Sequence, residues 1–148
     1  VLDASATSPE PGQVLITVLS RAGNGTASPE LLAIVDAALT DQSVRPLTDF
    51  VTVQGASILS YSVEAVLHFY AGPDRAVIMA NAQAAIEAYV AGQHRLGMDV
   101  TLSGIYAALH QPGVQRVDLI SPTANLVVDR ESAPYCTSIN LTDGGLDE

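Results

Sequence analysis

The sequence predicts an α+β protein with a two-layer fold, in which helices cover one face of a mainly antiparallel sheet. Strands and helices follow one another as strand-helix-strand and then strand-helix-helix-strand, which is typical of a ferredoxin-like (split βαβ) sandwich. The strand predicted over residues 58–70 alternates between an apolar face and a mixed face, which indicates that only one side is covered. Hydrophobic residues make up 48% of the chain but aromatic residues only 5%, which suits aliphatic helices packed on a sheet.

The length of 148 residues predicts one domain with flanking segments. We expect a linker over residues 1–12, the two-layer domain over 13–121, a small β appendage over 122–142 and a flexible acidic tail over 143–148. A chain of this size buries roughly 70% of its unfolded surface on folding, so it needs neither a metal nor a disulfide to be stable.

The first unit of the predicted domain begins with a strand over residues 13–20, which is apolar on both faces as a central strand would be. A helix follows over residues 29–39. Ser28 is its N-cap, Pro29 occupies the first helical position and Glu30 adds an acid to the first turn. The predicted buried stripe of this helix consists of Leu31, Leu32, Val35, Ala38 and Leu39.

Arg45-Pro46 interrupts the chain, because proline disfavours a helical conformation of the residue before it. Two strands are predicted next, over residues 50–57 and 58–70. The core face of the second strand carries Tyr61, Val63, Ala65, Leu67 and Phe69. Its mixed face carries Ser62, Glu64, Val66, His68 and Tyr70.

A long helix is predicted over residues 74–92, with Gly92 as its C-terminal stop. Its apolar stripe is Ile78, Ala82, Ala85, Ile86 and Tyr89, which we interpret as core while leaving open that the Tyr89 edge contacts another subunit. A short helix capped by Ser103 follows and carries an apolar stripe of Ile105, Ala108 and Leu109.

Pro112-Gly113 ends that helix, and residues 114–120 form a strand. We predict that Ile105, Leu109, Val117 and Leu119 are buried. Two short strands are expected at residues 126–128 and 135–141.

Charge and composition exclude several classes of function. The formal net charge is −10, and the six basic residues are all arginines scattered singly along the chain, which disfavours nucleic-acid binding. The absence of lysine excludes a P-loop lysine, a Schiff-base lysine and a lysine base. No apolar run approaches the ~18 residues of a membrane span, and one cysteine cannot form an internal disulfide. The N-terminus shows no signal-peptide pattern. Because the sequence lacks an initiator Met and opens with the flexible-looking VLDASATSPEPG, we expect either a fragment of a longer protein or a protein processed at its N-terminus, and we favour the fragment.

The loop at residues 23–28 is the first candidate for a ligand site, because its glycines and its position before a helix N-terminus could present backbone amides to an anion. However, Ser28 replaces the third glycine of a dinucleotide fingerprint, and the lysine of a phosphate-binding loop is missing. An ordinary strand-to-helix loop is the preferred interpretation.

The remaining candidates are single reactive side chains. His68, His94 and His110 show no metal-ligand spacing and are interpreted as isolated, solvent-facing histidines. Cys136 is interpreted as a packed thiol in a short strand rather than a nucleophile. The acids that could supply paired carboxylates are Glu64, Glu87, Asp99 and Asp118. We therefore predict no catalytic, cofactor-binding or metal-binding residue, and a protein that is not an enzyme.

Three segments carry a resemblance to a known family. They are PGQVLITVLSRAGNGTASPELLAIV, VRPLTDFVTVQ and RLGMDVTLSGIYAALHQPGVQRVDLISPTANLVV, and their motifs are RPLTD (residues 45–49) and VTLS-IYAALH-PGVQRV-L-SP (residues 100–122). Over residues 11–141 the chain resembles the C-terminal part of the baseplate J-like family, the baseplate assembly protein J of P2-type contractile-tailed phages.

The resemblance implies a structural component of the tail baseplate in a phage, prophage or contractile injection particle, without catalysis or cofactor. It also implies wedge assembly through contacts with copies of itself and with other baseplate proteins, in a virion tail assembled in the bacterial host cytoplasm. No nucleic acid, membrane or small-molecule substrate is expected as a partner. The alternatives are a ferredoxin-like regulatory module that binds a small anion at residues 23–28 and an enzyme that uses Cys136 or a histidine.

Overall fold

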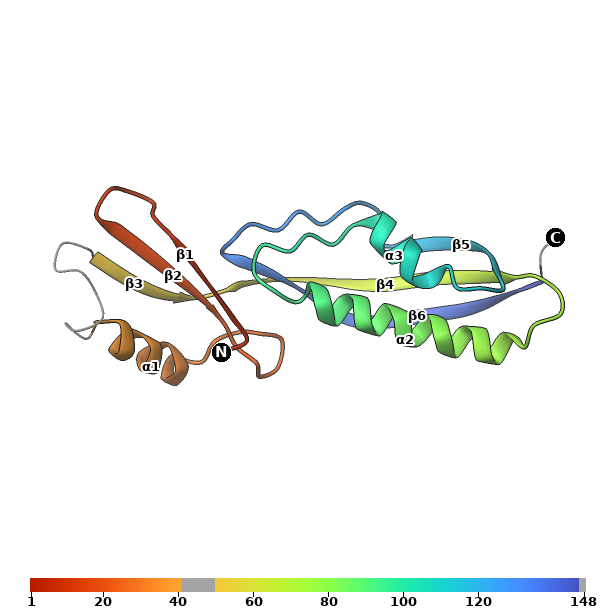
Figure 1. Cartoon of the computed structure of the whole chain (residues 1–148), viewed down its shortest axis with the longest axis horizontal. Helices are drawn as coiled ribbons and strands as arrows, with labels where there is room; N and C mark the ends of the chain where they lie inside the picture. The colour runs from red at the N-terminus through yellow and green to blue at the C-terminus, as the bar shows by residue number, and fades with distance from the viewer. Residues whose placement is uncertain (41–49, 147–148) are drawn as a thin grey trace. The chain divides into compact units, whose positions relative to one another are not determined.

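The computed structural model describes residues 1–40 and 50–146, which contain six strands and three helices (Figure 1). The strands form two three-stranded sheets, in the orders β1-β2-β3 and β5-β4-β6. Contacts within the chain divide it into two compact units. Unit 1 comprises residues 1–59, 95–98 and 128–133, and unit 2 comprises residues 60–94, 99–127 and 134–148.

The sheet of unit 1 is mixed. β1 (Asp3–Thr7) pairs antiparallel with β2 (Gln13–Leu19), and β2 pairs in parallel with β3 (Phe50–Gly55). A parallel pair needs a crossover connection, and α1 (Pro29–Thr40) lies in the connection between β2 and β3. The segment predicted as a linker therefore contains a strand. Its small and polar residues give no apolar signal, but β2 supplies a row of backbone partners from Leu15 to Leu19.

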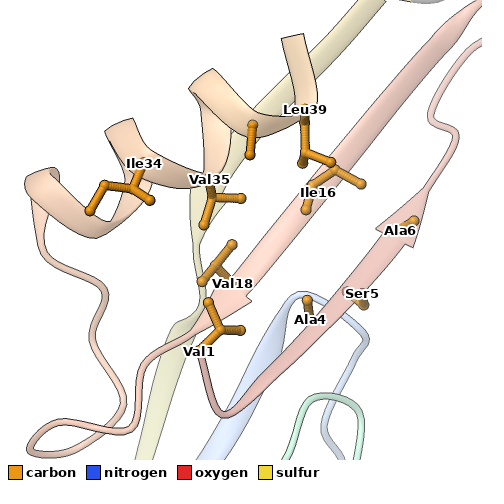
Figure 2. Close-up of a pocket in the computed structure, with 10 residues that line it drawn as sticks. Val1, Ala4, Ser5, Ala6, Ile16, Val18, Ile34, Val35 and Leu39 are labelled. Carbon is orange, nitrogen blue, oxygen red and sulfur yellow. The ribbon is translucent and has the colours of Figure 1, made fainter. Parts of the chain in front are cut away.

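The core of unit 1 includes Val18 and Leu19 of β2, which are fully buried. The predicted buried stripe of α1 is wrong, because no residue of this helix is buried. Ala38 is exposed, and the other four residues of the stripe are half-buried. Figure 2 shows the reason: α1 lies over the sheet with an apolar space between its side chains and those of β1.

Two later pieces of the chain complete unit 1. The Leu96 amide donates to Asp3 Oδ2 (3.1 Å), and the Ser5 hydroxyl donates to the Arg130 carbonyl (2.7 Å). The Ser57 amide donates to the Glu131 carbonyl (2.9 Å). These bonds hold residues 95–98 and 128–133 against the first strand and the beginning of β4 (Ser57–Phe69).

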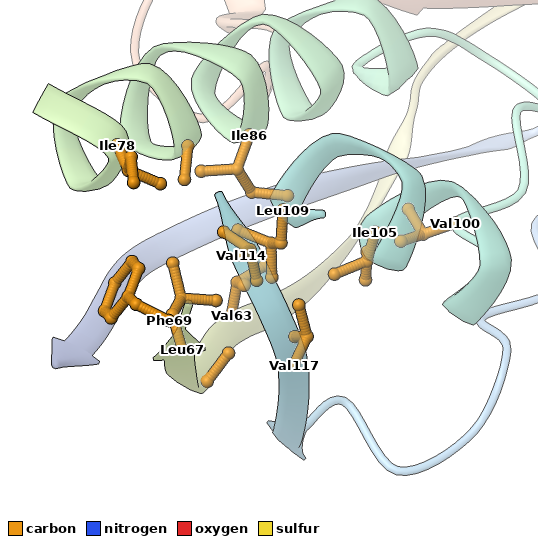
Figure 3. Packing of buried hydrophobic residues seen from close by; sticks show 12 residues of the cluster. Val63, Leu67, Phe69, Ile78, Ile86, Val100, Ile105, Leu109, Val114 and Val117 are labelled. Atoms are coloured by element: carbon orange, nitrogen blue, oxygen red, sulfur yellow. The ribbon is translucent and has the colours of Figure 1, made fainter. Parts of the chain in front are cut away.

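In unit 2 the central strand β4 pairs antiparallel with β5 (Val114–Ser121) and runs in the same direction as its other neighbour, β6 (Ser132–Leu146) (Figure 1). α2 (Arg75–Gln93) and α3 (Leu102–Leu109) contact each other and cover one face of this sheet. Their apolar residues meet the alternate residues of β4 in one core (Figure 3). The buried core consists of Val63, Ala65, Leu67, Phe69, Ile78, Ala82, Ile86, Val100, Ile105, Leu109, Val114 and Val117.

Several predictions for unit 2 are confirmed. The alternation along β4 places Val63, Ala65, Leu67 and Phe69 in the core as expected. α2 begins after the N-cap Asp74, whose side chain accepts from the Ala76 amide. Of the four residues predicted buried in the following segment, Ile105, Leu109 and Val117 are buried, whereas Leu119 is half-buried against the core.

Other boundaries differ from the prediction. Thr101, not Ser103, is the N-cap of α3: its backbone is extended and its side chain accepts from the Gly104 amide. The earlier start fits the bridge between Val100 and Leu126, which holds the preceding backbone extended and replaces the predicted strand at 126–128. The predicted strand at 135–141 and the first four residues of the predicted flexible tail belong to one long strand, β6, because they follow β4 to its end.

The α+β class is thus confirmed, but the ferredoxin-like arrangement is not. Such a sandwich has one sheet, whereas this chain has two sheets in two units, which also differs from the single domain predicted over residues 13–121. The two halves share the order of their elements, and an order of elements does not show whether their strands belong to one sheet or to two. The predicted interruption at Arg45-Pro46, the RPLTD motif and residues 147–148 lie outside the described residues.

Candidate functional site

In the loop at residues 23–28, two backbone amides donate to acceptors in the same part of the chain. The Gly25 amide donates to the Ala22 carbonyl (3.2 Å), and the Thr26 amide donates to Asn24 Oδ1 (3.0 Å). Ser28 caps α1, because its hydroxyl accepts from the Leu31 amide (3.2 Å). An anion at this helix end would have to compete with these internal acceptors. The geometry is that of a closed strand-to-helix loop, as preferred from the sequence.

His68 is the centre of a small charged cluster on the open face of the β4–β5 pair. Its Nε2 lies 2.9 Å from Asp118 Oδ2, and Arg116 Nε donates to Asp118 Oδ1 (3.1 Å). Desolvation raises the pKa of Asp118, but the hydrogen bonds and charges of Arg116 and His68 outweigh it and hold the pKa below its ordinary value. His68 is half-buried and bonded, so the prediction of an isolated, solvent-facing side chain is wrong here.

The other two histidines lie at the C-terminal ends of helices. His94 is the C-cap of α2. It is half-buried, with Nδ1 2.7 Å from the Pro134 carbonyl and its ring edge-to-face with Tyr135 at 5.4 Å. It therefore connects α2 to the start of β6 and is not isolated. His110 is the C-cap of α3 and is exposed, as predicted.

Cys136 is half-buried against the core of unit 2. Its thiol lies 3.2 Å from the Ser138 carbonyl, and burial raises the pKa of this thiol. A raised pKa keeps the group protonated at neutral pH, and the thiolate is the nucleophilic form. The packed-thiol interpretation fits these surroundings.

The four acids considered as paired carboxylates lie on different elements: Glu64 on β4, Glu87 on α2, Asp99 before α3 and Asp118 on β5. Glu87 accepts from Gln83 on its own helix (2.8 Å). Within residues 1–40 and 50–146, no three His, Cys, Asp or Glu side chains are grouped so that they could hold a metal ion. None of the three described helices is long and apolar enough to cross a membrane.

Sequence reasoning missed the junction of α2 and α3. The Thr101 amide donates to the Tyr89 hydroxyl (3.2 Å). Tyr89 therefore packs against the core and also forms a hydrogen bond with the N-cap residue of α3. Gly104 makes room for the ring: a Cβ at this position would lie 2.5 Å from Tyr89 Oη. A glycine inside a helix is the one signal that could have revealed this contact, because glycine there usually has a packing reason.

Unit 1 carries an apolar groove, which we call the α1–β1 groove (Figure 2). Its volume is about 440 Å³. Almost all of its accessible lining is apolar, and the residues that line it are Val1, Ala4, Ser5, Ala6, Ile16, Val18, Ile34, Val35, Ala38 and Leu39. Such a lining offers no charged or strongly polar group to a charged ligand.

Comparisons with known proteins agree with the two units. A model of the baseplate J-like central domain matches residues 1–55, and a model of the baseplate J-like protein C-terminal domain matches residues 61–142. The boundary between the two matches falls where unit 1 passes into unit 2 along β4.

Baseplate protein J of Escherichia phage P2 is 51% identical over 148 residues, which are 100% of this chain and 49% of that protein. The chain thus spans about half the length of this curated relative. Identity of this extent over the whole chain, together with two family models in the expected order, leaves one assignment. The chain belongs to the baseplate J-like protein family.

Proposed function

We propose that this chain is a structural part of the baseplate of a contractile phage tail, or of a related prophage or injection particle. It acts in baseplate wedge assembly through protein–protein contacts. The observation that carries the proposal is the 51% identity to baseplate protein J of phage P2 across every residue of the chain. Its location is then the virion tail baseplate, assembled in the cytoplasm of the bacterial host.

The chemistry of the chain supports an assembly role. His94 and Cys136 line one small pocket, but His94 Nδ1 lies 2.7 Å from the Pro134 carbonyl and the Cys136 thiol lies 3.2 Å from the Ser138 carbonyl. His68 is bonded to Asp118, and His110 lies at the end of α3. We propose that the protein is not an enzyme and needs no cofactor or metal. Its partners are other baseplate proteins and copies of itself, and nucleic acid, membranes and small-molecule substrates are not among them.

The proposal is tested by removing the gene from a phage or prophage that encodes the protein in full. We expect lysates of the deletion strain to contain heads and incomplete tails, and a plasmid copy of the gene to restore infectious particles. Labelling with an antibody against the chain should mark the baseplate end of the tail in electron micrographs. Normal particle yield without the gene would refute the proposal, as would label along the whole tail or on the head.

A further inference from the structure

β6 is an edge strand whose outer side has no partner strand among the described residues. Such an edge presents unpaired backbone amides and carbonyls, and proteins usually protect it by keeping the strand short or by placing charges or proline on it. β6 is 15 residues long, and its stretch from Thr137 to Thr142 contains no charged residue, no proline and no glycine. This stretch therefore lacks the usual protection.

The other edge strands of the two described sheets are protected in these ways. β1 has only five residues and β3 only six. β5 carries Arg116 and Asp118, and its register with β4 shifts at two places. Within the described part of the chain, β6 is thus the edge best suited to accept another strand.

The residues around Asn140 indicate what the added strand is. Ile139 and Leu141 are half-buried against the core. The exposed face carries Ser138, Asn140 and Thr142. Pairing the strand with an antiparallel copy centred on Asn140 places Ile139 opposite Leu141. The same pairing places Ser138 opposite Thr142, so the stretch is complementary to itself, as a two-fold interface requires.

Charge does not oppose this pairing, although each chain has a formal net charge of −10. Asp143 is the only acid in the sequence of β6, and it would lie opposite Thr137 of the second copy. The two Asp143 residues would be six residue steps apart along the strands, which is about 20 Å and at least about twice the Debye length at physiological ionic strength. Within each copy, Arg75 Nη1 also lies 3.2 Å from Asp143 Oδ1.

We propose that two copies of this chain pair antiparallel along the outer edge of β6, with the two-fold axis at Asn140. The three-stranded sheets of the two copies then form one continuous sheet. The pairing supplies hydrogen-bond partners for backbone groups that otherwise face water, and it brings Ile139 of each copy against Leu141 of the other. The inference rests on the self-contacts of the proposed function and names the surface that makes them.

Charge variants at Asn140 test this proposal. Sedimentation equilibrium of the chain should show a reversible equilibrium between monomer and dimer. Asn140→Lys and Asn140→Asp each place two like charges face to face at the axis, where opposite Cα atoms are about 5 Å apart. We expect each variant alone to dimerise roughly tenfold more weakly than the parent, and a mixture of the two to regain dimers. Ile120→Lys, at a 50% exposed position of the other edge strand, is the matched control and should behave like the parent.

Disulfide cross-linking locates the axis independently. Cα atoms joined by a disulfide are about 4.4–6.8 Å apart, so oxidation should join two Asn140→Cys chains into a covalent dimer. Ser138→Cys is the matched control, because Ser138 is exposed on the same face and its two copies would be about 14 Å apart. We expect Asn140→Cys to cross-link roughly tenfold faster than Ser138→Cys. The two native Cys136 thiols would be about 27 Å apart along the strands and should not cross-link.

A parent chain that stays monomeric at the highest soluble concentration would overturn the proposal. Dimers that persist in both charge variants would do the same, because the contact would then lie on another surface. Equal cross-linking of the two cysteine variants would also refute it, since the pairing would have no fixed register. These results are separate from the gene deletion: a monomeric chain whose loss still prevents tail assembly would remove this surface and leave the baseplate role intact.

Discussion

Replacing Gly104 by alanine tests the contact between α2 and α3 most directly. The new Cβ would lie 2.5, 2.7 and 2.8 Å from Oη, Cζ and Cε2 of Tyr89, whereas ordinary contacts between such atoms are about 3.5–4.0 Å. The ring must therefore move by about 1 Å. This movement also weakens the hydrogen bond from the Thr101 amide to the Tyr89 hydroxyl.

The expected magnitude follows from three terms. Overpacking costs about 1–3 kcal/mol, and the weakened hydrogen bond adds about 1 kcal/mol. Alanine recovers at most about 1 kcal/mol through its higher helix propensity. We therefore expect Gly104→Ala to lower the free energy of unfolding of unit 2 by about 1–3 kcal/mol.

Tyrosine fluorescence during urea unfolding measures unit 2 alone, because all five tyrosines lie in it and the chain has no tryptophan. Gly92→Ala is the matched control, since no atom lies within 4 Å of a Cβ at that helical position. It should stabilise unit 2 by up to about 1 kcal/mol. In a Tyr89→Leu background, Gly104→Ala should lose its destabilising effect. The same loss of stability with and without the Tyr89 ring would refute the packing argument.

Three further predictions concern the core, the charged cluster and the loop. Leu109→Asp places an unpaired carboxylate in the core and should unfold unit 2. The control Ala107→Asp, on the exposed side of the same helix, should fold. A folded, soluble Leu109→Asp protein would mean that Leu109 forms an interface. Because the folded pKa of Asp118 is below its unfolded value, its contribution to stability is present above that unfolded value, near pH 4, and is lost as the pH falls through the folded pKa. Urea midpoints of Asp118→Asn should therefore change less between pH 6 and pH 3 than those of the parent, and identical changes would contradict the role of this cluster. Phosphate or nucleotides should not raise the melting temperature, because the Gly25 and Thr26 amides of the loop already donate within it. A rise that is lost in a folded Gly25→Val variant would favour the anion-binding alternative.

The sequence predicted the parts of the fold that have a strong local period. The alternation along β4 and the helical stripe of α2 each place apolar residues at the spacing of their own element, so the element and its buried face could both be predicted. The core residues Ile105 and Leu109 could be predicted for the same reason.

The predictions that failed concern residues whose partners are distant in the sequence. β1 is a strand because β2 lies beside it, and no period of its own distinguishes the sequence DASAT from a linker. His94 is held by Pro134, 40 residues later, which no local pattern reveals. The stripe of α1 was predicted to be buried, but its burial depends on how closely the helix packs against the sheet, which the helical spacing does not reveal.

Unit 1 is assembled from three separate stretches of the chain, and this affects recombination between homologous genes. Residues 95–98 and 128–133 complete unit 1, although the chain around them belongs to unit 2. A single crossover near residue 60 between two homologous genes would join the first strands of one parent to closing stretches from the other. The partners of Asp3, Ser5 and Ser57 would then come from the second parent. These partners are backbone atoms of Leu96, Arg130 and Glu131, so we expect a hybrid to keep the three hydrogen bonds whichever parent supplies the later stretches.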